Sequence, residues 1–545
     1  MIAMKMMGAS IGNCVHVGGV VNFLKLAEKH GYQTQFLGPA VPVPKVAEEY
    51  EKWKPEIVAL SYRLTPETAK KIMLEVKEAK LAGRFGKARL IFGGTPEVSR
   101  IASELGIFDW VVTGSETPAD LDAWLSGQVA AQPRESFPST LVERIEKSQP
   151  FPIIRHHFGQ PSLESTIAGV KRIADARVLD VLSIAPDQNA QEFFFHQEQM
   201  KPELDGAGGV PLRNPEHLKA IYDAAKCGNF PILRCYAGTN ELTKWAEMLN
   251  ETIKIAWGAV PLFWYSQLDG RSVRPVETAI KENMETVAWY ASHGIPVEVN
   301  DSHHWSLRSA PDAVAVTSAF LAAFNAKNQG VKTYVAQLMF NTPPGTSPVM
   351  DLAKMLAKLE LMETLQDKEF HVIREARSGI ASLPLDEDAA KGHLGSSIHT
   401  MMAVKPHILH VVGYSEANSA ATPEVIIESC RIAAGSIRNA LLGLPDPLSD
   451  SKVVARKDRL VKEAKFLLAT IKEHYGELSP NPWIDPKTLA QTVKSGILDA
   501  PHLVGNKAGR GETVTKMVDG ACDAIDPKTG EVISEEQRLR LLGTL

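Results

Sequence analysis

Two arginines directly follow short apolar runs in the middle of the sequence, Arg155 in IIRHHFG and Arg234 in ILRCYAGT. A guanidinium group matches a carboxylate with two parallel hydrogen bonds, so arginines that converge on one cavity indicate a substrate with carboxylate groups. The same arginines could instead pair with acidic residues of the protein, and the sequence leaves that alternative open. With Asp187, Tyr265 and Gln337 they form the candidate catalytic set. Further candidates also follow apolar runs: Asn189, Trp264, Asn300, Asp301, Arg374, Arg377, Tyr414 and Glu416.

Two pairs of adjacent histidines, His156–His157 and His303–His304, raise the question of a metal site. Adjacent residues of a strand point to opposite faces, so each pair offers at most one inward ligand. No H-E-x-x-H or comparable spacing accompanies them, and metal binding here is the less favoured interpretation. The five cysteines are widely spaced without a C-x-x-C pair, which argues against a disulfide framework, an iron–sulfur cluster and a zinc ribbon.

The loop from Gly12 to Gly19 holds a single histidine, His16, between a predicted strand and a predicted helix. The loop has neither the G-x-G-x-x-G spacing that binds a dinucleotide nor the G-K-[ST] of a P-loop. His16 could be an axial ligand to a metal inside a cofactor, and Gly19 would let a bulky ring approach the backbone. Because a lone loop histidine is more often structural or exposed, the loop alone does not decide between these interpretations.

Short apolar runs alternate with helical patterns over residues 1–125, which predicts an α/β domain with a Rossmann-like (flavodoxin-like) parallel sheet covered on both faces. Ligands of such sheets bind at the carboxyl ends of the strands, so the loop with His16 lies at the expected binding edge. The predicted strands are 4–9, 33–37, 57–61, 89–92 and 110–113.

The alternation stops at residues 126–150, which are rich in proline, serine and glutamine and predict a linker with one short helix. Eight further strand–helix units follow over residues 151–445 and predict a (β/α)8 TIM barrel, the catalytic domain, with an open doubly wound sheet as the alternative. Residues 446–545 predict a C-terminal helical region, then a glycine-rich tail and a polar end. The predicted strands of the barrel are 152–155, 181–185, 231–235, 261–265, 296–300, 333–339, 369–374 and 408–413.

The composition is that of an average globular chain of several domains, with 545 residues, 44% hydrophobic and 23% charged. The net charge is −5, from 59 basic and 64 acidic residues without a long basic run, so we expect no nucleic-acid partner. No apolar stretch approaches the ~18–20 residues of a membrane span, and the start does not resemble a signal peptide. We therefore expect a cytoplasmic protein without a membrane partner.

Residues 1–125 resemble the cobalamin-binding domain of the corrinoid mutases and methyltransferases. The segments that carry the resemblance are Cys14-Val15-His16-Val17-Gly18-Gly19, Ser61-Tyr62-Arg63-Leu64-Thr65 and Gly93-Gly94. The resemblance implies that His16 is the lower axial ligand to cobalt in place of dimethylbenzimidazole. It also implies that Ser61 hydrogen-bonds the displaced nucleotide tail, which enters a pocket lined by Gly93 and Gly94. The complete set that it assigns to cofactor binding is Cys14, His16, Gly19, Ser61, Leu64, Gly93, Gly94 and Gly114.

The sequence departs from that family at two positions. Cys14 stands where the family has an aspartate that orients the ligating histidine, and a thiol is a poor acceptor for an imidazole N–H. Loss of such a partner typically weakens a metal site ~10–100-fold. Arg63 stands in the serine loop, where the family's pattern is shorter and apolar.

Residues 152–500 resemble the catalytic epsilon chain of glutamate mutase (methylaspartate mutase). The matching stretches include IIRHHFGQPSLES, VLSIAPDQNAQEFFF, PILRCYAGTNEL and SGILDAP. The resemblance implies an isomerase, a radical mutase that uses adenosylcobalamin to rearrange the carbon skeleton of a small carboxylic or amino acid, and a homodimer. It implies that Arg155 and Arg234 bind substrate carboxylates. The family's catalytic glutamate falls near Trp264, with Gln267 and Asp269 nearby, so the substrate itself stays open.

Two other functions remain compatible with the sequence. The first is a corrinoid-dependent methyltransferase, in which the barrel would bind the methyl donor or acceptor. The second is a cobalamin-binding protein whose site has drifted and is no longer catalytic, a hypothesis motivated by Cys14 and Trp264.

Overall fold

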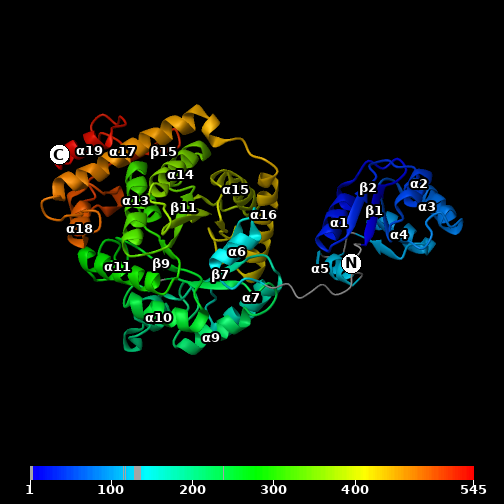
Figure 1. Cartoon of the computed structure of the whole chain (residues 1–545), viewed down its shortest axis with the longest axis horizontal. Helices are drawn as coiled ribbons and strands as arrows, with labels where there is room; N and C mark the ends of the chain where they lie inside the picture. Colours follow the sequence, from blue (N-terminus) through cyan, green and yellow to red (C-terminus); the bar gives the residue numbers. More distant parts are fainter. Residues whose placement is uncertain (1–3, 114–115, 117, 128–136, 237) are drawn as a thin grey trace. The chain divides into compact units, whose positions relative to one another are not determined.

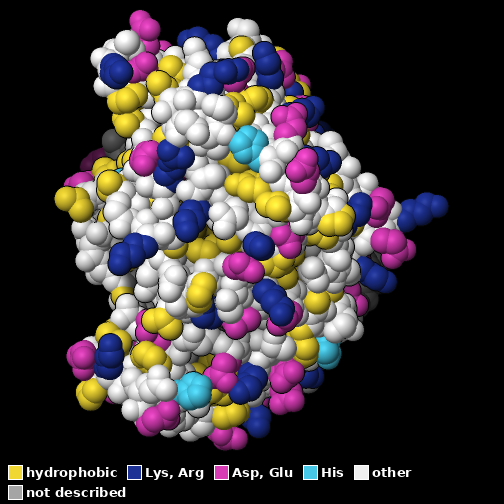
Figure 2. Space-filling model, turned by 90° about the vertical axis from the view of Figure 1, so that its left-hand side faces the viewer, with side chains coloured by type: hydrophobic (Ala, Val, Ile, Leu, Met, Phe, Trp, Pro, Cys, Tyr) yellow, Lys and Arg dark blue, Asp and Glu magenta, His cyan; other side chains and the backbone are white. Residues whose placement is uncertain are grey.

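The computed structural model of the chain, shown in Figure 1, describes residues 4–113, 116, 118–127, 137–236 and 238–545. The chain forms two compact units, Met1–Ser136 and Phe137–Leu545. None of the helices in the described part of the chain combines the length and the apolar character that a membrane span requires. On the face drawn in Figure 2, basic and acidic side chains are interspersed and neither sign forms a continuous field.

The first unit is a five-stranded parallel sheet in the order β2-β1-β3-β4-β5, which is the flavodoxin-like order. Apolar cores cover both faces of the sheet, one built with α2, α3 and α4 and the other with α1 and α5. The order reverses between β1 and β3, and crevices for ligands lie beyond the carboxyl ends of the strands at such a point. The strands are β1 (Lys5–Ser10), β2 (Gln33–Phe36), β3 (Ile57–Tyr62), β4 (Arg89–Gly94) and β5 (Trp110–Val112). The helices are α1 (Gly18–Lys29), α2 (Val43–Trp53), α3 (Pro66–Leu81), α4 (Pro96–Leu105) and α5 (Pro118–Ser126).

The second unit is built on eight parallel strands in the order β8-β7-β6-β13-β12-β11-β10-β9. The two ends of this order approach each other, and a backbone hydrogen bond of 2.8 Å runs from Ala256 to Leu233, so the barrel is nearly closed. The prediction of eight parallel barrel strands is confirmed. They are β6 (Ile153–Phe158), β7 (Val181–Ile184), β8 (Ile232–Cys235), β9 (Gly258–Val260), β10 (Val297–Val299), β11 (Thr333–Phe340), β12 (His371–Ser378) and β13 (Ile408–His410).

Helices follow the strands and form the outer layer of the barrel (Figure 1). The long helices are α7 (Leu163–Asp175), α9 (Pro215–Ala224), α10 (Leu242–Ile253), α11 (Val276–Ser292), α13 (Asp312–Asn328), α14 (Pro348–Glu363), α15 (Glu387–Met401) and α16 (Pro423–Leu441). Two short helices, α8 (Gln188–Phe193) and α12 (Ser302–Ser306), directly follow β7 and β10. Residues at these positions lie at the carboxyl ends of the strands, where barrel enzymes carry their active sites.

Helix α6 (Leu141–Ser148) lies inside the segment that was predicted to be a linker, but it belongs to the barrel unit. Its N-cap, Thr140, accepts a hydrogen bond from the Glu143 amide. Leu141 and Ile145 are buried in one cluster with the first residues of several barrel strands. The amphipathic helix therefore covers the amino end of the barrel, and only the part of the predicted linker before Phe137 lies outside this unit.

One predicted barrel strand is wrong in position. The fourth strand is Gly258–Val260, and residues 261–265 form the loop that follows it. Pro261 has no N–H to donate to a sheet ladder, and Tyr265 has a φ of 60°, which no strand residue adopts. Trp264 and Tyr265 consequently lie beyond the carboxyl end of β9 and not in the wall of the barrel.

The C-terminal region contains α17 (Ser451–Tyr475), α18 (Pro486–Ser495), α19 (Glu535–Leu541) and a hairpin of β14 (Thr515–Val518) and β15 (Ala521–Ala524). The prediction of a helical region is correct for α17, whereas the hairpin replaces part of the predicted polar end. Its turn residues Asp519 and Gly520 both have positive φ, as the Asp-Gly turn of a two-residue hairpin requires. Arg456 of α17 joins the hairpin to the barrel through Asp523, at 2.7 Å, and Asp312, at 2.9 Å.

We predict that Arg538→Leu destabilises the barrel unit by about 3–5 kcal/mol, because it leaves the buried Glu535 carboxylate without its cation. Arg538 is 2% exposed and donates to Glu535, Gly496 and Ile497. The measurement is chemical denaturation followed by circular dichroism. The matched control is Arg540→Leu in the same helix, whose pair with Glu536 is exposed and should contribute little. Equal stability of the two variants would contradict the assigned role of Arg538.

Candidate functional site

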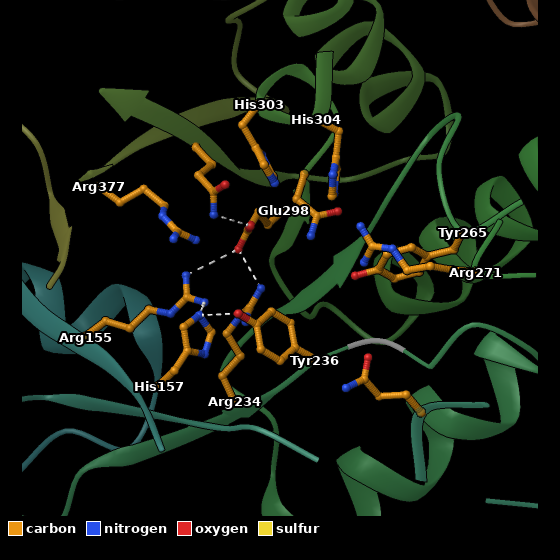
Figure 3. A pocket seen from close by; sticks show the side chains of 13 residues that line it. Arg155, His157, Arg234, Tyr236, Tyr265, Arg271, Glu298, His303, His304 and Arg377 are labelled. Carbon is orange, nitrogen blue, oxygen red and sulfur yellow. Dashed lines mark hydrogen bonds and ion pairs between the residues drawn. The ribbon is translucent and has the colours of Figure 1, made fainter. Parts of the chain in front are cut away.

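A cavity of about 170 Å³ lies at the carboxyl ends of the barrel strands; we call it the barrel cavity (Figure 3). It is lined by Arg155, His157, Gln191, Arg234, Tyr236, Tyr265, Arg271, Glu298, Asn300, His303, His304, Gln337 and Arg377. These residues come from β6, β8, β10, β11 and β12, from the loops after β8, β9 and β10, and from α8 and α12. Ligand pockets for drug-sized molecules are typically ~300–1,000 Å³, so the barrel cavity suits a small metabolite.

Strand periodicity explains which side chains reach the barrel cavity. Successive residues of a strand alternate between two faces, so i, i+2 and i+4 point the same way. On β12, Ile373 packs in the apolar cluster at the amino end, and Arg377 lines the cavity four residues later. Arg374 is out of phase with both and instead pairs with Glu363 at 2.6 Å. The same alternation applies to β6 and β8. Ile153 and Ile232 pack in the apolar cluster, and two residues later Arg155 and Arg234 line the cavity.

A layer of charged and polar side chains lies between the apolar cluster and the cavity. We call it the charged layer: Arg155, Arg234, Glu298, Gln337 and Glu375. Glu298 accepts hydrogen bonds from Arg234 at 2.9 Å and from Gln337 at 2.8 Å. Arg155 donates to Glu375. Both arginines therefore pair with acids of the protein, as one of the two sequence interpretations proposed.

The indole of Trp257 supports the charged layer. Its Nε1–H donates to Glu298 at 2.9 Å, and its ring centroid lies 5.3 Å from the guanidinium carbons of both Arg155 and Arg234. The negative face of an aromatic ring attracts cations, and the attraction is stronger where water is excluded. Trp257 is fully buried, so it helps to hold the two guanidinium groups in fixed positions.

Burial and neighbouring charges act in opposite directions on this layer. Burial disfavours charge on Glu298, but Arg234 and Arg155 outweigh it and lower its pKa. Burial likewise disfavours charge on Arg234, but Glu298 and Glu375 outweigh it and raise its pKa. Burial raises the pKa of Glu375, and its Oε2 has no hydrogen-bond partner. Glu298 and Arg234 thus form a lasting ion pair.

The pairing leaves guanidinium donors unused. The Nε and Nη1 groups of the fully buried Arg234 have no partner. Arg377 donates through Nε to the Ser378 carbonyl at 3.2 Å, and its other nitrogens make no hydrogen bond or ion pair with any described residue. Arg271 pairs with Asp269 at 3.1 Å and lies over the ring of Tyr265. Four arginines line the cavity against a single lining carboxylate among the described residues, so the cavity attracts anions.

Three neutral histidines complete the wall. Burial, together with nearby cations, lowers the pKa of His157, His303 and His304 well below the ordinary value, so none carries a charge at neutral pH. His157 Nε2 contacts the hydroxyl of Tyr236 at 2.8 Å. Among the other ring nitrogens, His157 Nδ1, His303 Nδ1 and both nitrogens of His304 are buried without a hydrogen-bond partner. Among the described residues, no group of three or more His, Cys, Asp or Glu side chains is placed to hold a metal ion.

Unpartnered acceptors face the same space as the unpartnered donors. The Oδ1 of Asn300 and the Oε1 of Gln337 are buried without a hydrogen bond. Buried polar groups without partners are uncommon in native proteins, and several around one cavity indicate a ligand that satisfies them. The arrangement suits a small molecule with anionic oxygens for the arginines and a hydroxyl or ammonium group for the amide oxygens.

The structure brings four of the five candidate catalytic residues together: Arg155, Arg234, Tyr265 and Gln337 all line the barrel cavity. Asp187 does not. Its carboxylate accepts from the amides of Ala190 and Gly206 and pairs with Arg213 at 2.6 Å. It caps α8 and fixes the following loop, so the expectation that it meets the substrate is corrected.

Sequence reasoning missed several lining residues. Arg271 escaped notice because the strand before its loop was misplaced, and Glu298 because a single acid in the short run V-E-V carries little signal. Trp264, near which the sequence resemblance placed a catalytic glutamate, is fully buried and is not part of the lining. Glu298, on the next strand, is the carboxylate that does line the cavity.

A second cavity, of about 830 Å³, lies in the first unit at the carboxyl ends of its strands; we call it the N-terminal cavity. Its inner wall is apolar, formed by Val20, Phe23 and Leu26 of α1 and by Ala59, Ile91 and Val112 of the sheet. Its other lining residues are His16, Gly19, Asn22, Leu60, Ser61, Tyr62, Arg63, Gly93, Gly94, Thr95, Pro96, Thr113, Glu116 and Leu121. The structure thus brings together five predicted cofactor-binding residues: His16, Gly19, Ser61, Gly93 and Gly94.

Three other predicted residues have different positions. Cys14 is fully buried behind the loop, with its Sγ 3.8 Å from His16 Nδ1. Leu64 packs against the core on the α2–α4 side of the sheet and is not part of the lining. Gly114 lies outside the described residues.

Two observations indicate that the N-terminal cavity fits the nucleotide tail of a corrinoid. The Oγ of Ser61 is buried without a partner, and a Cβ built on Gly93 would meet only the Val112 side chain, at 4.0 Å, so a side chain there would take up cavity space. A Cβ on Gly94 would lie 2.7 Å from the Tyr62 carbonyl oxygen, so this glycine is needed for strand packing. His16 is exposed at the mouth, and its contact with Cys14 through Nδ1 leaves Nε2 for a metal.

Residues 4–121 match the family model of the B12 binding domain. No curated protein matches the chain. Among solved structures, a cobalamin-binding protein from Desulfitobacterium hafniense DCB-2 is 26% identical, with a TM-score of 0.20; the match covers 24% of this chain and 60% of that one.

Two further structures are similar at lower identity. The BexX/CysO complex of Amycolatopsis orientalis is 10% identical, covering 54% of this chain and 93% of that chain with a TM-score of 0.28. The cobalamin-dependent S-adenosylmethionine radical enzyme OxsB is 9% identical, and the match covers 80% of this chain and 56% of that chain with a TM-score of 0.17. The family match shows that the chain begins with a B12 binding domain.

We predict that Arg377→Gln weakens binding of a short dicarboxylate such as succinate or glutarate by about 1.5–3 kcal/mol, roughly a tenfold to hundredfold rise in Kd. Titration calorimetry on the whole chain measures it. Arg374→Gln is the matched control, because Arg374 lies on the same strand but points away from the cavity. An unchanged Kd in Arg377→Gln, or an equal loss of affinity in both variants, would contradict the assignment of the barrel cavity as the binding site.

Proposed function

We propose that this chain is an adenosylcobalamin-dependent mutase that rearranges the carbon skeleton of a small carboxylate-bearing acid. The observation that carries the proposal is the pairing, in one chain, of a B12 binding domain with a barrel cavity that holds unused arginine donors. The resemblance of the barrel sequence to glutamate mutase supports the reaction type. The cavity's size and charge support the substrate class.

The substrate is a free acid of a few carbons. The barrel cavity of about 170 Å³ is too small for a thioester of a large carrier. The unused groups of Arg234 and Arg377 bind its carboxylates, and the amide oxygens of Asn300 and Gln337 accept from a hydroxyl or ammonium group. Glu298 is a positioning residue: it uses both oxygens to hold Arg234, Gln337 and Trp257.

The barrel also controls protons and water around the substrate. His157, whose pKa burial lowers, and the Tyr236 hydroxyl, whose pKa burial raises, are both uncharged at neutral pH and present polar atoms without adding charge. Buried walls exclude water, which would quench reactive species and weaken the hydrogen bonds to the substrate. Tyr265 stacks with Arg271 at the edge of the cavity and keeps that guanidinium in place.

The cofactor is held in the first unit by His16, Gly19, Ser61, Gly93 and Gly94. When bound, adenosylcobalamin supplies radical chemistry, while the protein supplies binding, orientation and shielding. The buried Ser61 hydroxyl forms a hydrogen bond with the nucleotide tail, and the apolar wall packs against the base of that tail.

The activity is tested by incubating the protein with adenosylcobalamin, in the dark and without oxygen, with ¹³C-labelled short carboxylic and amino acids. We expect one acid to give a product with a rearranged skeleton in the NMR spectrum, and Arg377→Gln to lose most of that product. Transfer of the methyl group of methylcobalamin to an acceptor, with no rearrangement of any acid, would favour the methyltransferase instead. Absence of any product despite cofactor binding would favour a non-catalytic cobalamin-binding protein.

We predict that the cobalt ligand depends on His16 and that Cys14 limits its strength. In electron paramagnetic resonance of bound cob(II)alamin, the wild type should show coupling to a protein nitrogen, and His16→Ala should lose it. Cys14→Asp restores an anionic acceptor for His16 Nδ1 and should tighten cobalamin binding by about tenfold or more.

The matched control is His30→Ala in the same unit, because His30 pairs with Asp122 and is not part of the N-terminal cavity. It should leave both the coupling and the affinity unchanged. Nitrogen coupling that persists in His16→Ala would contradict the assignment of the ligand, and weaker binding in Cys14→Asp would contradict the role of Cys14.

A further inference from the structure

Arg63 lines the N-terminal cavity at its mouth and has no partner there. It is exposed, and among the residues that the structure describes it makes no hydrogen bond or ion pair. It follows Tyr62, whose buried ring and 2.9 Å hydrogen bond to Asn13 fix the end of β3. The loop is also short, because Thr65, two residues later, is the N-cap of α3. The backbone at Arg63 is therefore well defined, while its side chain is available.

Arg63 is the one lysine or arginine among the described residues that line this cavity. The acidic residue of the lining, Glu116, already accepts hydrogen bonds from the amide and hydroxyl of Thr113. An anion at the mouth would thus meet an unpaired guanidinium. The first turn of α4 starts at the same edge, where Thr95 caps it without a side-chain hydrogen bond, and its amides also favour negative charge.

The cavity changes character from its inner wall to its mouth. The inner wall of Phe23, Ile91 and Val112 suits a planar apolar base. Ser61 lines the same cavity, and its buried Oγ can form one hydrogen bond with a ligand there. Arg63 follows Ser61 by two residues. A nucleotide tail has this same order of chemistry, from an aromatic base through a ribose to an anionic phosphodiester.

We propose that Arg63 binds the phosphodiester of the corrinoid's nucleotide tail. The inference rests on the proposed cofactor and adds to it a recognition residue for the tail. Guanidinium and phosphate oxygens form paired charged hydrogen bonds, which lysine does not reproduce in the same geometry. Arg63 therefore selects complete cobalamins over corrinoids that lack the nucleotide.

The test compares binding of cobalamin with that of cobinamide, which has the same corrin ring but no nucleotide phosphodiester, by visible absorption. The variants are Arg63→Leu and Arg63→Lys, with Arg84→Leu as the matched control. Arg84 lies between α3 and β4, outside the cavity lining. Arg63→Leu should weaken cobalamin binding about tenfold and leave cobinamide binding unchanged. Arg63→Lys should recover part of the lost cobalamin affinity. Added salt should reduce the difference in cobalamin affinity between the wild type and Arg63→Leu.

Each other outcome has a defined meaning. An equal effect of Arg63→Leu on both corrinoids, or no effect on either, overturns the inference while the cofactor assignment stands. Failure of the wild type to bind any corrinoid overturns the proposed cofactor and the inference with it. Inorganic phosphate is the remaining probe. Tight binding of phosphate alone, lost in Arg63→Leu, would assign Arg63 to a free anion in place of the nucleotide tail.

Discussion

The buried Glu298 carboxylate holds Arg234, Gln337 and Trp257 at the centre of the barrel, and the geometry of the cavity depends on these bonds. A charge removed from water must be paired and fully hydrogen-bonded, or it destabilises the fold by several kcal/mol. Glu298 and Glu375 supply the paired charge for Arg234 and Arg155, but the Nε and Nη1 groups of Arg234 and the Oε2 of Glu375 have no hydrogen-bond partner. Because Glu298 binds only one end of the Arg234 guanidinium, the other donors stay free. The two interpretations of the arginines, as partners of internal acids and as substrate ligands, are therefore compatible within one layer of side chains.

The two cavities rely on different physical interactions. The barrel cavity is small, polar and positively charged, with neutral histidines among its arginines. The N-terminal cavity is larger and mainly apolar, with polar groups at Ser61 and at its mouth. Under the proposed function, burial of an aromatic base would supply affinity in the N-terminal cavity, whereas charged hydrogen bonds would supply it in the barrel cavity. The proposed mutase needs this combination of a site for a large cofactor tail and a site for a small acid.

The sequence was sufficient for the order of strands and helices in both units, because buried parallel strands and amphipathic helices leave clear periodic patterns. It was less informative where local chemistry overrides that pattern. Pro261 was taken into a strand that ends before it, and the Asp519-Gly520 hairpin was missed although the turn dipeptide is visible in the sequence. For the site, a position near the carboxyl end of a predicted strand identified Arg155, Arg234 and Gln337. It failed for Asp187, because no pattern shows that a distant arginine takes its carboxylate.

The most direct test of the account is the visible spectrum of the adenosylcobalamin-loaded protein, recorded without oxygen as short dicarboxylic and amino acids are added one at a time. We expect one small acid to change the spectrum of the bound cofactor, at concentrations that match its binding to the barrel. We also expect this change to be absent in a variant without Arg377. Saturating binding of both cofactor and acid without any change in the spectrum would show that the two sites do not serve one reaction and would contradict the account.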